Sequence, residues 1–272
     1  MKHFITPAEL VKEQAKYIIL DIRGQKAYGA AHIPNAYVLD VTIDLSGPVK
    51  KHGGRHPLPD FNVLADKLAS FGITKDSHIV VYDSWLFLAG RLWWTLRYMG
   101  LSHVKVLAGG IERWIHEGQP VTNIPTPLQT TTASFNYHLQ DHMVMTHDHV
   151  LESSQTRSHI IIDARTPERY TGTDIDTMDG MTGHIPTAIN HFWADGFDAN
   201  GPLPQEQLKD VFKNILSVTK PIVTYCGSGI TACLTMLAMA EIGIESALYV
   251  GSSSDWVTYP NAPIATGIES IK

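Results

Sequence analysis

One stretch of the sequence combines a nucleophilic side chain with a turn that can hold an anion. Residues 222–225 form a β-branched run typical of a buried strand, and the apolar spacing of residues 230–242 is typical of a helix. Cys226 lies between them, beside Gly227 and Gly229. Glycine adopts backbone angles closed to other residues, so several N–H groups of this turn can point at one centre near the positive end of the helix dipole. Such a nest would favour the nucleophilic thiolate form of Cys226.

The cysteine content also allows a simpler interpretation. Free cysteine is commonly buried, so Cys226 could be a structural residue in a strand-to-helix turn. The second cysteine, Cys233, lies seven residues further on within the expected helix, where we interpret it as a core residue. With 2 cysteines in 272 residues, we expect two free thiols, as in a reducing compartment.

The loop Cys226-Gly-Ser-Gly-Ile-Thr-Ala resembles the active-site loop of the 3-mercaptopyruvate sulfurtransferases, in the rhodanese superfamily. The tyrosine phosphatases share a strand, a cysteine loop and a helix, but they need Cys-x5-Arg to hold phosphate, and Ala232 occupies that position here. The resemblance implies that Cys226 carries the sulfur and that the following loop contacts the substrate. The substrate-binding candidates in this loop are Gly227, Gly229, Ile230 and Thr231, with Ser228 as a catalytic candidate.

The chain contains an internal repeat. Three short motifs occur twice, at offsets of 142 to 152 residues. They are Ile-Leu-Asp21-Ile-Arg23 with Ile-Ile-Asp163-Ala-Arg165, His32-Ile-Pro with His184-Ile-Pro, and Ile79-Val-Val-Tyr-Asp83 with Ile222-Val-Thr-Tyr-Cys226. Expected strands and helices alternate along the chain, which is typical of an α/β fold with parallel sheets. We therefore predict a tandem duplication with domains at residues 1–118 and 135–272, joined by a linker at 119–134 that is rich in Pro and Thr.

The two copies serve as controls for each other. Residues that both copies keep are interpreted as structural, with Asp–Arg pairing as the simplest account. They are Asp21 and Asp163, Arg23 and Arg165, His32 and His184, and Trp114 and Trp256. At the position of Cys226 the first copy has Asp83, followed by bulky residues rather than glycines. We therefore expect the first domain to lack the nest and to be catalytically silent.

The repeat extends the resemblance to nearly the whole chain, because the family has two rhodanese-like domains of which the second carries the cysteine. It implies an α/β fold of two tandem rhodanese-like domains, each a doubly wound, mainly parallel sheet flanked by helices. Ligands of such sheets bind outside the carboxyl ends of the strands, where Cys226 would lie. The resemblance also implies that the long polar loop at residues 40–59 brings Arg55 and His56 to the site.

The family's substrate arginine falls on Arg169, which the first copy replaces with Ala27. Arginine suits this work because its planar guanidinium can hold a carboxylate through two hydrogen bonds without losing its charge. A solvated surface arginine is the alternative interpretation. A second substrate arginine, expected some nine residues further on, falls near Met178 in an acidic stretch. Arg55 is therefore a candidate to replace it.

Composition limits the partners and the compartment. The formal net charge is −6 with scattered Lys and Arg, which argues against a nucleic-acid or anionic-membrane surface. The N-terminus becomes polar too soon for a signal peptide, and no apolar run approaches the roughly 18 residues of a membrane span. We therefore expect a cytoplasmic protein. The expected partners are a small-molecule sulfur donor and a thiol acceptor, such as a small thiol or a thioredoxin-like protein.

A cluster of histidines raises the possibility of a metal site. The histidines are His138, His142, His147 and His149, with acidic residues between them. We expect no metal there, because structural zinc sites prefer cysteine as well and a solvated helix-turn region explains the cluster. We also expect no organic cofactor, because the chemistry suggested by the cysteine loop does not require one.

The sequence as a whole predicts a sulfurtransferase. Cys226 would take a sulfane sulfur, become a persulfide and pass the sulfur to a thiol or cyanide in a ping-pong cycle. Ser228 would stabilise the anionic sulfur, Arg169 would position the donor and His56 would assist proton transfer. Enzymes dedicated to thiosulfate are similar to this chain but carry Cys-Arg-Lys-Gly in the loop, so the neutral loop here favours 3-mercaptopyruvate as the donor.

Three alternatives remain open at this stage. The first is a thiosulfate sulfurtransferase, or rhodanese, with the same persulfide mechanism. The second is a sulfur-carrier or persulfide-sensing module without catalytic activity. The third is an arsenate- or phosphate-directed enzyme built on the same fold.

Overall fold

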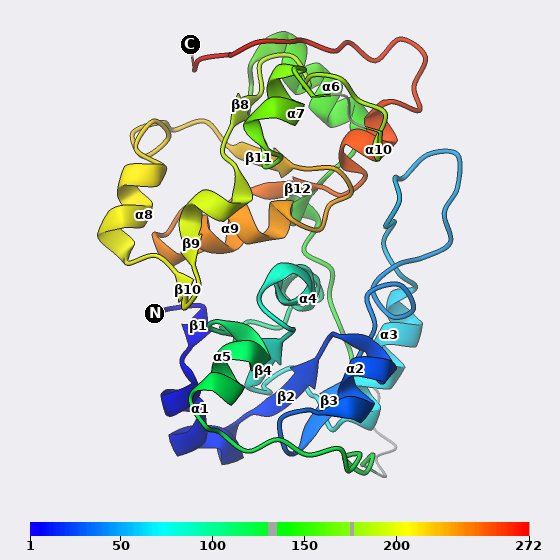
Figure 1. The fold of residues 1–272 in the computed structure, drawn as a ribbon. Coiled ribbons are helices and arrows are strands. Elements are labelled where there is room, and N and C mark those ends of the chain that lie inside the picture. The colour runs from blue at the N-terminus through cyan, green and yellow to red at the C-terminus, as the bar shows by residue number, and fades with distance from the viewer. Residues whose placement is uncertain (130–134, 175–176, 272) are drawn as a thin grey trace. The chain divides into compact units, whose positions relative to one another are not determined.

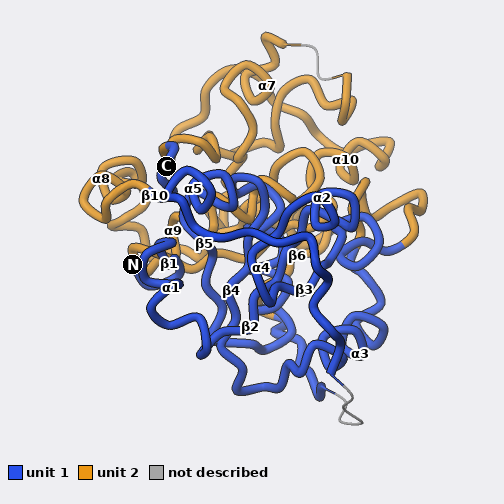
Figure 2. The backbone as a smooth tube through the Cα atoms, turned by 60° about the horizontal axis from the view of Figure 1, so that its bottom comes forward, with its two compact units in different colours: residues 1–47, 58–141, 199–202 blue, residues 48–57, 142–198, 203–272 orange. Residues whose placement is uncertain are grey.

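Each copy of the repeat forms one parallel sheet of five strands. The structure is a computed structural model that describes residues 1–129, 135–174 and 177–271, so the end of the predicted linker, residues 130–134, lies outside the described residues. The chain divides into two compact units (Figure 2). Unit 1 comprises residues 1–47, 58–141 and 199–202, and unit 2 comprises residues 48–57, 142–198 and 203–272. Segment 48–57 thus belongs to unit 2, although it comes from the first copy in sequence.

The sheet of unit 1 has the strand order β1-β5-β4-β2-β3, and all its pairs are parallel. Figure 1 labels β1, β4, β2 and β3 of this sheet. Helices flank it. The elements are β1 (Phe4–Ile5), α1 (Pro7–Glu13), η1 (Gln14–Lys16), β2 (Ile18–Asp21), α2 (Gly24–Ala30), β3 (Ala36–Val38), α3 (Phe61–Ser70), β4 (Ile79–Tyr82), α4 (Phe87–Tyr98), β5 (Val104–Leu107), α5 (Gly110–His116) and the short β10 (Gly201–Pro202).

The sheet of unit 2 has the order β6-β12-β11-β7-β8, again with parallel pairs throughout. Its elements are β6 (Val144–Met145), α6 (His147–Thr156), β7 (Ile160–Asp163), α7 (Pro167–Thr171), β8 (Ile189–Asn190), η3 (Trp193–Gly196), β9 (Phe197–Asp198), α8 (Gln205–Val211), β11 (Ile222–Tyr225), α9 (Ala232–Glu241), β12 (Ala247–Tyr249) and α10 (Ser252–Trp256). A short 3-10 turn, η2 (Asp141–Met143), precedes β6.

The two sheets have the same strand order once the strands are paired by sequence, which confirms the duplication and the predicted α/β fold. The central pairs also share their register, since Asp21 lies opposite Tyr82 in one sheet and Asp163 lies opposite Tyr225 in the other. Every residue of β7 and β11 is buried, as expected for parallel strands covered on both faces. Asp163 and Tyr225, which end these two strands, are therefore held side by side at the carboxyl edge of the sheet.

The helix that follows the cysteine loop is a core helix rather than an amphipathic one. All ten residues of α9 are buried, and their composition is apolar with few exceptions. A helix that is apolar all round requires burial on all sides. Within the described part of the chain, no helix has the length and apolar character needed to cross a membrane.

Two of the residue types that both copies keep have the same structural role in each. The indole N–H of Trp114 donates to the carbonyl of Pro120 at 2.8 Å, and that of Trp256 donates to the carbonyl of Pro263 at 2.9 Å. The shared histidines each stack on a tyrosine and contact that tyrosine's carbonyl at 2.8 Å. These pairs are Tyr28 with His32 and Tyr170 with His184. The structural interpretation of these shared residues is confirmed.

Asp83 lies after β4, where Cys226 lies after β11. Its carboxylate oxygen Oδ2 accepts hydrogen bonds from the N–H groups of Leu88 at 2.6 Å and Ala89 at 3.3 Å, and the side chain is buried, with 3% exposed. The expectation that this loop lacks converging N–H groups is wrong, because the first turn of α4 supplies them without glycines. Unit 1 thus keeps an anion position and fills it with its own carboxylate.

The burial of Asp83 predicts a pH dependence of stability. Burial raises the pKa of the Asp83 carboxyl to about 6, so between about pH 4 and 6 the folded chain keeps a proton that the unfolded chain releases. This contribution to stability is present below about pH 4 and is lost as the pH rises through about 6. Relative to Asp83→Asn, the free energy of unfolding of the wild type should fall by about 3 kcal/mol between about pH 3 and pH 7.

Chemical denaturation of both proteins at a series of pH values measures this difference. The asparagine variant is the control for all other titrating groups, because it has the same size and no charge. Two stability profiles that stay parallel over this range would show that Asp83 titrates with an ordinary pKa.

Candidate active site

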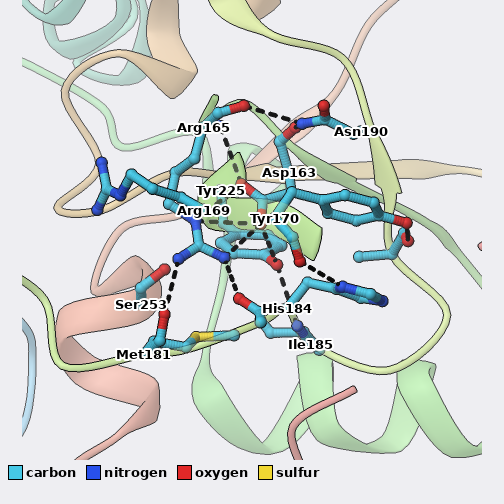
Figure 3. Close-up of polar contacts among 12 residues, drawn as sticks. Asp163, Arg165, Arg169, Tyr170, Met181, His184, Ile185, Asn190, Tyr225 and Ser253 are labelled. Atoms are coloured by element: carbon cyan, nitrogen blue, oxygen red, sulfur yellow. Dashed lines mark hydrogen bonds and ion pairs between the residues drawn. The ribbon is translucent and has the colours of Figure 1, made fainter. Parts of the chain in front are cut away.

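A buried ion pair holds the end of the strand that carries Cys226. Arg165 Nη2 lies 2.6 Å from Asp163 Oδ2, and Arg165 Nε lies 3.0 Å from Asp163 Oδ1 (Figure 3). The hydroxyl of Tyr225 donates to Asp163 Oδ2 at 2.7 Å and accepts from the N–H of Ile185 at 3.1 Å. Since Tyr225 precedes Cys226 directly, this network fixes the start of the cysteine loop.

The network also holds residues 181–183, in the segment that leads to β8. The guanidinium of Arg165 donates to the carbonyls of Gly183 at 2.5 Å and Met181 at 3.4 Å. Burial, and then the charge of Asp163, raise the pKa of Tyr225 well above its usual range, so its hydroxyl stays protonated. Loss of one partner would leave an uncompensated buried charge, at a cost of about 3–5 kcal/mol. Asp21 and Arg23 form the equivalent pair in unit 1, which confirms their predicted structural role.

Cys226 itself is buried, with 1% of its surface exposed. The backbone N–H of Gly229 donates to its sulfur at 3.2 Å. Gly229 has a φ of 74°, in the left-handed region that glycine adopts without strain, and this conformation turns its N–H toward the sulfur. One backbone N–H of the predicted nest therefore lies at the sulfur of Cys226.

The serines that follow the neighbouring strand β12 form hydrogen bonds with the backbone of the cysteine loop. Ser252 Oγ accepts from the N–H of Cys226 at 3.1 Å, and the N–H and hydroxyl of Ser253 both donate to the carbonyl of Cys226, at 3.0 and 2.8 Å. The N–H of Ser254 donates to the carbonyl of Gly227 at 2.9 Å. Sequence reasoning missed these serines. The Gly-Ser-Ser-Ser run after β12 could have indicated them. The carboxyl ends of adjacent parallel strands meet at one edge of a sheet, so polar residues after β12 lie near the cysteine after β11.

The other loop residues lie as follows. Ser228 is buried, Ile230 and Thr231 are half-buried, and Thr231 is the residue that precedes α9. Both cysteines are free, and Cys233 is a fully buried core residue whose thiol donates to the carbonyl of Gly229 at 3.4 Å. The prediction of two free thiols with Cys233 in the core is therefore confirmed.

Segment 48–57 packs within unit 2 on the loop after β12. The N–H of Gly53 donates to Asp255 Oδ1 at 2.7 Å, and the N–H of Arg55 donates to Ser254 Oγ at 3.1 Å. His52 contacts Thr258 Oγ1 at 2.7 Å. The segment is thus anchored on α10, whose first residues also hydrogen-bond to the cysteine loop. Arg55 and the half-buried His56 belong to this segment.

Arg55 and Arg169 meet at a carboxylate that the sequence did not single out. Arg55 Nη2 lies 2.6 Å from Asp179 Oδ1, and Arg169 Nη2 is paired with Asp179 Oδ2. Arg169 is 24% exposed and paired, so it is not a solvated surface arginine. Met178, where the family resemblance led us to look for a second arginine, is exposed. The structure therefore brings the two candidate arginines to one point, next to Gly227.

The sequence of this chain matches a known protein family in both of its halves. The Rhodanese-like domain family matches residues 6–117 and again residues 146–259. The chain belongs to the rhodanese family. Both the predicted family and the predicted duplication are confirmed, with one copy of the family domain in each half of the chain.

Two curated relatives illustrate the range of names in this family. A probable 3-mercaptopyruvate sulfurtransferase from Pseudomonas aeruginosa is 36% identical over 252 residues, covering 90% of this chain and 87% of the relative. A thiosulfate sulfurtransferase from Cricetulus griseus is 32% identical over 266 residues, covering 92% and 84%. This rhodanese-family protein is accordingly a sulfurtransferase.

Solved structures agree with the family assignment. The crystal structure of SseA from Escherichia coli, described as a 3-mercaptopyruvate sulfotransferase, is 27% identical with a TM-score of 0.80, and the match covers 93% of this chain and 99% of that one. A 3-mercaptopyruvate sulfurtransferase from Leishmania major is 25% identical with a TM-score of 0.83, covering 97% and 76%. The fold predicted from the sequence is therefore confirmed.

The two cysteines give a direct prediction. After incubation with a sulfur donor, the intact mass of the wild type and of Cys233→Ser should rise by one sulfur atom, because both keep the sulfur that Gly229 stabilises. Cys226→Ser should show no such increase. Mass spectrometry before and after treatment with a reductant checks that the added sulfur is a persulfide. A persulfide found on Cys233 would contradict the assignment.

Proposed function

We propose that this protein takes the thiol sulfur of 3-mercaptopyruvate, holds it as the sulfane sulfur of a persulfide on Cys226, and passes it to a thiol or cyanide. The observation that carries the proposal is a neutral cysteine loop with two arginines at its edge. Gly227 and Ser228 place no cation beside the sulfur, whereas Arg55 and Arg169 converge where a carboxylate would bind. The identity to a relative named for 3-mercaptopyruvate supports the same donor.

The first half-reaction transfers sulfur to the enzyme. The Cys226 thiolate attacks the sulfur of 3-mercaptopyruvate, an S–S bond forms and the C–S bond of the donor breaks. The electron pair of that bond stays on the donor carbon as the enolate of pyruvate, which takes up the proton of the donor thiol. The products are pyruvate and a persulfide anion on Cys226.

The second half-reaction returns the enzyme to its starting state. A thiolate or cyanide attacks the outer sulfur of the persulfide, the S–S bond breaks and its electron pair returns to Cys226 as a thiolate. The product is a new persulfide or thiocyanate. A small thiol or a thioredoxin-like protein would serve as the acceptor, and a reducing cytoplasm suits an enzyme with two free thiols.

Each side chain of the site has a distinct part in this scheme. The N–H of Gly229, which lies 3.2 Å from the sulfur of Cys226, would stabilise that sulfur as an anion. Ser228 would donate to the developing enolate oxygen, and Ile230 and Thr231 would line the same loop. Arg169 and Arg55 would hold the donor carboxylate, and His56 would move the proton between the donor thiol and the enolate carbon.

Thiosulfate is the second candidate donor, because several relatives of similar identity are named thiosulfate sulfurtransferases. Thiosulfate is a compact dianion and gains from cations beside the sulfur. A unit charge about 4 Å away contributes on the order of 4 kcal/mol at a surface-like dielectric, before desolvation is subtracted. The neutral loop of this chain provides no such charge at positions 227 and 228.

We predict that kcat/KM for 3-mercaptopyruvate exceeds that for thiosulfate by at least about tenfold, a difference of about 1.4 kcal/mol in transition-state binding. Ser228→Lys should narrow the ratio by adding a cation, and Ser228→Met is the neutral control of similar length. Steady-state kinetics with both donors and cyanide as acceptor measure the ratio. Equal or better use of thiosulfate by the wild type would instead favour the second candidate.

A further inference from the structure

The arginine pair beside the cysteine loop already holds a carboxylate of the protein itself. The side chain of Asp179 is fully buried, with 0% exposed, while those of Arg55 and Arg169 are 38% and 24% exposed. One carboxylate oxygen is paired with Arg55 at 2.6 Å and the other is paired with Arg169. This is the interaction that the proposed function assigns to the carboxylate of the sulfur donor.

Asp179 also lies directly against the cysteine loop. A Cβ atom added to Gly227 would lie 3.0 Å from Asp179 Cγ and 3.3 Å from Arg169 Nη2, and it would collide with Asp179 Oδ2. Only a residue without a side chain fits there while Asp179 stays in place. The carboxylate of Asp179 thus contacts Gly227, the residue that directly follows the nucleophile Cys226.

The pairing leaves part of each arginine side chain exposed. The side chains of Arg55 and Arg169 are 38% and 24% exposed, although Nε of Arg55 is buried. Asp179 is paired with Nη2 of each arginine, and a guanidinium has five N–H donors. A second anion can therefore contact the exposed part of the arginines while Asp179 remains in place.

We propose that Asp179 is a specificity-determining residue, an internal carboxylate that limits the charge of the sulfur donor to one negative unit. This inference extends the proposed function, because it concerns the same donor site. Two guanidiniums and one carboxylate carry a net charge of +1. A monocarboxylate donor brings the site to neutrality, whereas a dianion leaves one uncompensated negative charge.

The uncompensated charge is costly because it lies close to Asp179, whose side chain is fully buried. A second anion close to a buried carboxylate is repelled more strongly than in bulk solvent. A monoanion meets the same repulsion from Asp179, but its attraction to the two arginines offsets it. Asp179 therefore weakens the binding of all anions and weakens that of dianions most.

Asp179→Asn tests this directly, because asparagine keeps the size of the side chain and removes the charge. Pyruvate serves as an unreactive monocarboxylate and sulfate as an unreactive dianion, and isothermal titration calorimetry measures the affinity of each for the free enzyme. The variant should bind sulfate at least about tenfold more tightly than the wild type, with a smaller gain for pyruvate. The ratio of kcat/KM values should shift toward thiosulfate by a similar factor.

The matched control is Asp174→Asn, which changes the net charge equally at an exposed position of the same segment. It should leave both affinities unchanged. Unchanged or weaker sulfate binding by a folded Asp179→Asn protein would overturn the proposal and would show that Asp179 only positions the arginines. An equal gain for sulfate and pyruvate would also overturn it.

A second variant covers the case in which Asp179→Asn does not fold. Arg55→Gln lowers the net charge of the site from +1 to zero, so it should weaken sulfate binding more than pyruvate binding. An equal loss for the two anions would overturn the proposal. Persulfide loading of Cys226, followed by mass spectrometry, separates this inference from the proposed function. Absent loading contradicts the function, whereas normal loading with unchanged anion selectivity contradicts only the role of Asp179.

Discussion

The buried pair of Asp163 and Arg165 is the interaction on which the site depends. It closes the end of β7, holds the carbonyls of Met181 and Gly183, and through the hydroxyl of Tyr225 fixes the residue before the cysteine. A buried ion pair contributes little net stability, but it is costly to break because either partner alone is an unpaired charge. Its value is therefore positional. It ties together three segments of unit 2, and one of them leads directly into Cys226.

The duplicated fold places a side chain that accepts backbone hydrogen bonds after the equivalent strand of each unit. In unit 2 it is Cys226, whose sulfur accepts from the N–H of Gly229 in the loop before α9, and in unit 1 it is Asp83, whose carboxylate accepts from the first turn of α4. In both units, N–H groups that no helical carbonyl satisfies lie between the end of a parallel strand and the first turn of the next helix. The fold supplies the anion position, and the residue at that position decides whether it can do chemistry.

The sequence predicted the features that depend on local pattern. The strand before Cys226, the glycine turn and the helix after it could be predicted because their periodicity and turn residues are contiguous, and the repeat made the structural role of Trp114 and Trp256 visible. The bridging carboxylate of Asp179 could not be predicted, because its contacts with Arg55 and Arg169 join segments that only the tertiary fold brings together. The family resemblance implied that segment 48–57 reaches the site, but its anchoring contacts with Ser254 and Asp255 depend on the tertiary fold. The serine run after β12 was visible in the sequence, but its hydrogen bonds to Cys226 and Gly227 were not.

Position 227 couples the charge of the cysteine loop to the charge of the donor site. The approach of Asp179 requires glycine there, so a loop that carries an arginine at this position cannot coexist with Asp179 in its present place. A loop cation and an internal carboxylate would also neutralise each other, which would cancel the effect of either on the donor. Under the proposed role of Asp179, the charge of the donor would be set by two positions together. A neutral loop with Asp179 and a cationic loop without it are the two consistent arrangements, and this chain has the first.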